Sequence, residues 1–142
     1  MTQKGFTLIE LVVTLVILTI LGAIAVPLFV YLQGEAKQSN EEAVAGAVRT
    51  GIMNFFLDLN HGNRTNYPCQ LDTILISPGL PVACTENTKC FQNVLANGGV
   101  TSEWEKISGD FSCLASTYKS SATSTNIWTY TPFNGEFKRT TP

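Results

Sequence analysis

An apolar run from Phe6 to Leu32, FTLIELVVTLVILTILGAIAVPLFVYL, contains one charged residue, Glu10. A segment of this length can cross the roughly 30 Å hydrocarbon core of a membrane as a helix. A carboxylate on such a helix costs several kcal/mol unless a positive charge neutralises it. The sequence therefore predicts that Glu10 has a cationic partner.

The short leader MTQKG before this run suggests where the cation comes from. A cut after Gly5 would leave a new, positively charged amine on Phe6, about one helical turn from Glu10. Two other interpretations are a secretory signal cleaved near Ala23-Ile24-Ala25 and a plain membrane anchor. The apolar part of a secretory signal is shorter, on the order of 7 to 15 residues, and neither alternative explains Glu10.

The rest of the chain is large enough for one small domain. We expect three parts within the 142 residues: a leader at 1–5, a membrane-spanning and polymerisation helix at 6–32, and a globular head at 33–142. Net charge is −2, and the 9 lysines and arginines are scattered along the sequence. This distribution does not form the basic patch of a nucleic-acid-binding protein, so nucleic acid is not an expected partner.

The helix is expected to continue into the head as an amphipathic segment. Its apolar stripe comprises Val44, Val48, Ile52, Phe55, Phe56 and Leu59. Polar residues fill much of the remaining surface, namely Lys37, Glu41, Glu42, Arg49 and Asp58. We expect a kink or loosening between Gly22 and Pro27, because proline lacks the amide donor that a helix requires. His61-Gly62-Asn63 is a predicted stop, with His61 as a helix cap.

The fold class expected for the head is α+β, with a small antiparallel sheet packed on this stripe. Predicted strands are Phe111–Tyr118, Ile127–Thr131 and Glu136–Thr140, the last two joined by a turn at 132–135. Trp128 and Tyr130 should share one face of their strand. Residues 96–105 are expected to form a loop followed by a short helical turn.

Four cysteines, Cys69, Cys84, Cys90 and Cys113, all follow the apolar run. Their even number and position predict two disulfides in an oxidising compartment. Three pairings are possible, of which Cys69 with Cys84 and Cys90 with Cys113 is the one we favour. No closely spaced cysteine pair supports zinc, and no nucleophile motif accompanies the single histidine. We expect no metal, no cofactor and no enzymatic activity.

The segment KGFTLIELVVTLVILTILGAIAVP resembles the amino terminus of type IV pilins and the related pseudopilins. The matching features are Lys4 and Gly5 before the cut, Phe6 after it, Glu10 at fixed spacing, and Pro27 in the apolar helix. Trp128-Thr129-Tyr130 with Asn134-Gly135-Glu136 is similar to the final hairpin of these families. The resemblance implies the pilin fold, a long amino-terminal helix packed on a small sheet head.

The resemblance also implies a processing and assembly route. A prepilin peptidase would cut between Gly5 and Phe6 on the cytoplasmic side and methylate the Phe6 amine. The subunit would wait in the inner membrane with its head outside the cytoplasm, until an assembly platform and a cytoplasmic ATPase extract it into a filament. Within this helical homopolymer, Glu10 of one copy and the Phe6 amine of its neighbour would set the register.

We therefore expect a structural subunit of a type IV pilus-like filament that ends in the periplasm or outside the cell. Two alternatives stay open. The first is a pseudopilin of a type II secretion system, which would push folded proteins outward through a short filament. The second is a minor pilin whose head binds DNA or a surface.

Overall fold

The computed structural model describes residues 5–58, 66–76, 80–109, 112–120 and 126–140. The chain divides into two compact units, Met1–Ala36 and Lys37–Pro142. We call the second unit the head and describe each unit by itself.

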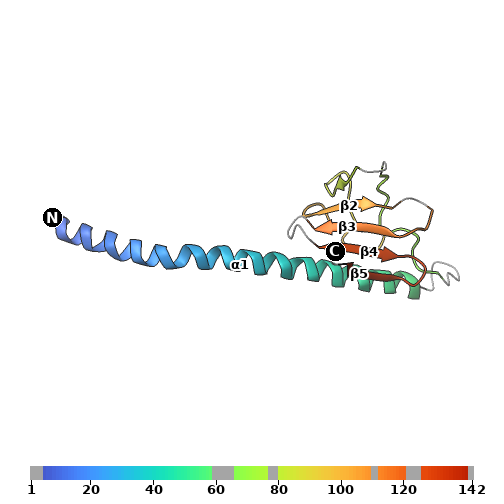
Figure 1. The fold of residues 1–142 in the computed structure, drawn as a ribbon, viewed down its shortest axis with the longest axis horizontal. Coiled ribbons are helices and arrows are strands. Elements are labelled where there is room, and N and C mark those ends of the chain that lie inside the picture. The colour runs from blue at the N-terminus through green and yellow to red at the C-terminus, as the bar shows by residue number, and fades with distance from the viewer. Residues whose placement is uncertain (1–4, 59–65, 77–79, 110–111, 121–125, 141–142) are drawn as a thin grey trace, which may run out of the picture. The chain divides into compact units, whose positions relative to one another are not determined.

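A single helix, α1 (Leu8–Leu57), accounts for 50 residues and belongs in part to each unit (Figure 1). The sequence prediction of a long helix is confirmed. α1 continues through Pro27 without a break in its helical assignment, so the bend at Gly22 and Pro27 stays a prediction. The predicted stop at His61-Gly62-Asn63, with the cap at His61, lies outside the described residues.

Five strands form one antiparallel sheet in the head. They are β1 (Val82–Ala83), β2 (Trp104–Ser108), β3 (Ser116–Ser120), β4 (Ile127–Thr131) and β5 (Glu136–Thr140). Strands adjacent in the sequence are adjacent in the sheet, so the order is β1-β2-β3-β4-β5 (Figure 1). The predicted bounds of β4 and β5 are confirmed, and Thr131 pairs with Glu136 at their turn.

The first part of the sheet differs from the sequence prediction. β3 begins at Ser116 rather than at Phe111, which lies outside the described residues. Cys113 has a positive φ of 58°, which an extended strand does not accommodate. The helical turn expected before Glu105 is also wrong, because Trp104 opens β2. β2 alternates with Trp104 and Lys106 buried, a period of two that fits a strand.

The core of the head lies between one face of the sheet and the second part of α1. Ala45, Val48 and Ile52 supply the buried face of the helix, and Trp128 and Tyr130 lie together on the core face of β4 as predicted. The other large members of the core are Leu71, Ile74, Phe91, Trp104, Tyr118 and Phe137. Val44, Phe55 and Phe56 of the predicted stripe are half-buried, and Leu59 lies outside the described residues.

The four cysteines form two disulfides, as expected, but the favoured pairing was wrong. Cys69 pairs with Cys113 and Cys84 with Cys90. The segment between Cys84 and Cys90 turns back on itself, because Thr85 and Thr88 exchange backbone hydrogen bonds of 3.0 and 3.2 Å. This local reversal brings Cys84 and Cys90 together and leaves Cys69 for Cys113.

Candidate functional site

In the amino-terminal unit, the residues predicted for processing and register lie just before and just after the start of α1. Gly5, Phe6 and Thr7 precede the helix and are exposed, with Phe6 76% exposed. A side chain added at Gly5 would meet nothing within 4 Å. The fold around Gly5 therefore does not require glycine, and a requirement there would come from an enzyme that recognises the bond to Phe6.

Thr7 caps the helix. Its Oγ1 accepts a hydrogen bond of 3.4 Å from the backbone N–H of Glu10, while its carbonyl accepts one of 3.3 Å from the N–H of Leu11. Thr7 and Glu10 thus stand at the N-cap and N3 positions of a capping-box sequence. The cap determines where the helix begins and so fixes Glu10 in its first turn.

Glu10 is exposed, and among the described residues no cation lies within ion-pair distance of it. Its negative charge is favourable beside the positive end of the helix dipole. The apolar side chains that follow are also uncovered: the most apolar 18-residue stretch of α1 is 0% buried. By length and composition, α1 can cross a membrane. The run from Phe6 to Leu32 therefore presents a single carboxylate on an apolar surface that the chain itself does not cover.

In the head, Glu41 is placed differently from the sequence prediction. We expected it on the polar surface of the helix, but it is only 2% exposed and its carboxylate accepts a 2.6 Å hydrogen bond from Trp128 Nε1. Trp128 is fully covered and needs an acceptor for its N–H. The hydrogen bond of Glu41 therefore links α1 to β4 and fixes their relative position in the head. Its spacing from Ala45 and Val48 along the helix is the sequence signal that could have revealed it.

A buried ion pair joins Asp72, in the segment between α1 and β1, to Lys106 on β2. Lys106 Nζ lies 2.8 Å from Asp72 Oδ1 and donates to the carbonyl of Ile74 at 3.1 Å. The hydroxyl of Tyr118 donates to the other Asp72 oxygen at 2.8 Å. Burial, followed by the negative charge of Asp72, raises the pKa of Tyr118 well above its usual 10.0. Because Asp72 and Lys106 are far apart in the sequence, no local pattern identifies them as partners.

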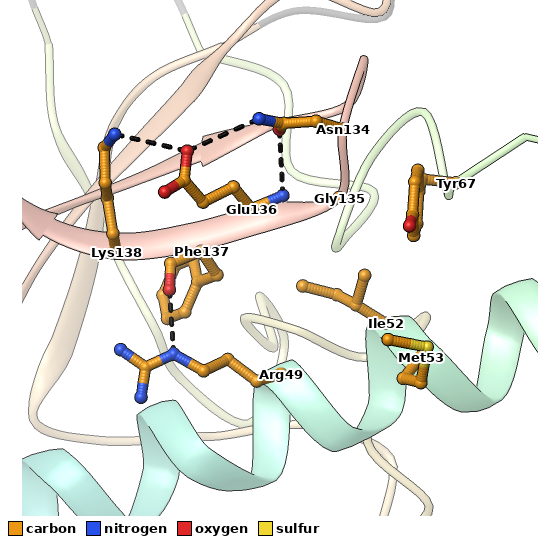
Figure 2. Close-up of a pocket in the computed structure, with 9 residues that line it drawn as sticks. All are labelled: Arg49, Ile52, Met53, Tyr67, Asn134, Gly135, Glu136, Phe137 and Lys138. Carbon is orange, nitrogen blue, oxygen red and sulfur yellow. Dashed lines mark hydrogen bonds and ion pairs between the residues drawn. The ribbon is translucent and has the colours of Figure 1, made fainter.

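A pocket of about 350 Å³ lies between α1 and the β4–β5 hairpin. Figure 2 shows Arg49 and Ile52 of the helix extending toward Phe137 on β5, and Met53 also lines the pocket. Several polar groups at its wall are engaged: Arg49 Nε donates to the Phe137 carbonyl at 2.9 Å, and Lys138 pairs with Glu136 at 3.2 Å. The other lining residues are Tyr67, Asn134 and Gly135. No serine, cysteine or histidine is among these described lining residues.

Residues 1–26 match the family model of the prokaryotic N-terminal methylation motif. Gly5, Phe6 and Glu10 fall within this match. The amino-terminal segment of the chain is similar to that of type IV pilins.

Three relatives are named as type IV pilus, pilin or fimbrial proteins. The chain is 58% identical over 50 residues to the major component of the type IV narrow pilus of Thermus thermophilus, covering 35% of this chain and 43% of the relative. It is 43% identical over 54 residues to the type IV major pilin of Myxococcus xanthus, covering 38% of this chain and 24% of that protein. It is 31% identical over 86 residues to a type IV major fimbrial protein of Dichelobacter nodosus, covering 61% and 54%.

The chain thus spans between about a quarter and a half of the length of these pilins. No solved structure matches it significantly. The residues that we predicted for processing and register lie in the matched pilin segment, whereas Glu41, the buried ion pair and the disulfides lie beyond residue 26.

Proposed function

We propose that this chain is a structural subunit of a type IV pilus-like filament. The observation that carries the proposal is Glu10, the single carboxylate in the uncovered apolar stretch of α1, which begins just after Gly5 and Phe6 in a methylation motif. The three relatives are named as pilus or fimbrial major proteins, which favours a major pilin over a secretion pseudopilin or a minor pilin.

The first step is processing. A prepilin peptidase cuts the exposed bond between Gly5 and Phe6 and methylates the new amine of Phe6. Residues 6–32 then hold the subunit in the inner membrane, with the head outside the cytoplasm, where its two disulfides are stable. The proposed division of the chain is a leader at 1–5, a membrane and polymerisation helix at 6–32, and a globular part at 33–142 that includes the head.

The second step is polymerisation. Apolar helices of neighbouring copies replace lipid around one another, so packing rather than escape from water holds them together. An uncompensated charge in this apolar core makes polymerisation unfavourable. Glu10 of one copy is neutralised by the Phe6 amine of the next only at one axial offset, so the pair selects the register. Head-to-tail contacts that do not close give an open helix.

Extraction from the membrane requires work, because lipid already surrounds the apolar helix. An assembly platform and a cytoplasmic ATPase supply that work in this proposal. Neither bound nucleic acid nor a cofactor has a role in it.

Processing is tested by mass spectrometry of the mature amino terminus. We expect the wild-type chain to begin at an N-methylated Phe6 and Gly5→Ala to leave the leader attached. Since a methyl group at Gly5 meets nothing within 4 Å, a processing defect would report recognition by the peptidase rather than misfolding. Normal processing of Gly5→Ala would contradict the peptidase step.

The register argument is tested by Glu10→Ala. The variant should insert into the membrane and be processed, yet give few filaments in a shearing assay. A wild-type filament yield from Glu10→Ala would contradict the role of the charge pair.

A further inference from the structure

Besides Glu10, the apolar run contains three threonines, Thr7, Thr14 and Thr19. Thr7 is occupied as the helix cap. With 3.6 residues per turn, Thr14 follows Glu10 by about one turn and lies on the same face, whereas Thr19 follows it by about two and a half turns and lies on the opposite face. Thr14 is therefore the polar side chain beside the carboxylate, and Thr19 is its counterpart far from it.

The hydroxyl of Thr14 is oriented as an acceptor. It donates its proton to the carbonyl of Leu11 at 2.8 Å. Thr19 makes the equivalent bond to the carbonyl of Val16, also at 2.8 Å. Because the only hydrogen of each hydroxyl is used in this way, its lone pairs are what it offers to a neighbour. On the Glu10 face, this places an acceptor one turn beyond a carboxylate.

The partner expected at this face has two donors. A singly methylated, protonated Phe6 amine keeps two N–H groups, which diverge at about the tetrahedral angle. One carboxylate accepts one of them with good geometry but not both. Water is excluded from a bundle of apolar helices, and an N–H left without an acceptor there is costly. Two donors therefore call for two acceptors.

We propose that Thr14 and Glu10 of one copy together receive the methylated Phe6 amine of a neighbouring copy, Glu10 neutralising its charge and Thr14 accepting its second N–H. The site consists of two side chains on the flank of the helix, and its occupant is a second copy of this chain. The inference depends on the proposed function and adds a positioning residue to it.

The test compares Thr14→Val with Thr19→Val in the full-length chain expressed in cells. Valine keeps the shape and branching of threonine and replaces the hydroxyl with a methyl group, and each variant loses the same type of bond to its own helix. We expect both variants to be inserted and processed normally. Purified Thr14→Val filaments should release roughly tenfold more subunit on mild heating, whereas Thr19→Val and Thr14→Ser filaments should behave as wild type.

A double-mutant cycle provides a readout that packing alone would not change. If Thr14 acts through the amine that Glu10 holds, Thr14→Val should have little further effect in a Glu10→Gln background. Equal behaviour of Thr14→Val and Thr19→Val, or additive effects with Glu10→Gln, would overturn the inference. Loss of processing in Thr14→Val would also overturn it, because the role proposed here follows cleavage. Absence of any filament from the wild-type chain would instead contradict the proposed function.

Discussion

At the scale of single residues, the head depends on polar groups that are buried and paired. Lys106 and Asp72 are at most 1% exposed, and Asp72 is further satisfied by the hydroxyl of Tyr118 and the N–H of Ile74. Removing one member of a buried pair is far more costly than replacing both, because the remaining charge has no compensation.

Lys106→Met should lower the free energy of unfolding of the head by about 3–5 kcal/mol, since it leaves Asp72 buried without its cation. The double variant Lys106→Met with Asp72→Asn should recover part of this loss, because the amide oxygen can still accept from Tyr118. Denaturant unfolding with the disulfides intact measures both. A Lys106→Met variant as stable as wild type would show that the pair contributes nothing.

The buried tyrosines predict a loss of stability in alkali. Burial raises the pKa of Tyr130, with a smaller contribution from Tyr67, and burial also raises the pKa of Tyr118. The folded head therefore keeps both hydroxyls protonated at pH values where an unfolded chain would ionise them. Their contribution is present in full below about pH 10 and declines as pH rises above it.

This prediction is checked by unfolding the head between pH 8 and pH 12. The decline of the free energy of unfolding with rising pH should be less steep in Tyr118→Phe and Tyr130→Phe, because phenylalanine has no hydroxyl to ionise. If this pH dependence were unchanged in both variants, groups other than these two tyrosines would cause the loss of stability in alkali.

At the scale of elements, the sequence predicted what local periodicity encodes. The long helix, the β4–β5 hairpin and the shared face of Trp128 and Tyr130 follow from patterns within short segments, and all are confirmed. β1 and β2 were not predicted, because Val82–Ala83 is too short to show a period and Lys106 at a buried position of β2 obscures its apolar face. The disulfide pairing and the Asp72–Lys106 pair depend on tertiary contacts, which periodicity does not report.

The approach of α1 to the loop at Val94 gives a matched pair of glycine variants. A methyl group at Gly51 would collide with the backbone carbonyl of Val94, whereas one at Gly46 would meet nothing within 4 Å. Alanine favours the helix by about 1 kcal/mol over glycine at either position. We expect Gly46→Ala to stabilise the head and Gly51→Ala to destabilise it, as measured by thermal unfolding.

A backbone carbonyl cannot move aside as a flexible side chain can, which is why the steric effect should dominate at Gly51. If both variants were stabilised to the same extent, the close approach of the helix to Val94 would be incorrect.

At the scale of the whole molecule, the two units differ in how their apolar side chains are covered. Among the described residues, the whole buried core lies in the head, and the most apolar 18-residue stretch of α1 has no buried residue. A chain shortened to residues 37–142 should therefore be a soluble monomer with both disulfides, whereas the full chain should require detergent. Size-exclusion chromatography and thiol titration measure this, and aggregation of the shortened chain would show that the head needs the amino-terminal unit.

The bond between Cys69 and Cys113 closes a loop with a sequence separation of 44. An extended chain spans at most about 3.3–3.6 Å per residue. When force is applied to the head at points outside the loop, the crosslink therefore prevents roughly 150 Å of chain from being extended. Even after its sheet has come apart under tension, a subunit with this bond intact can lengthen only through the segments on either side of the loop. An oxidised filament built from such subunits would thus have a fixed upper limit to its stretch, and a reducing environment would raise that limit.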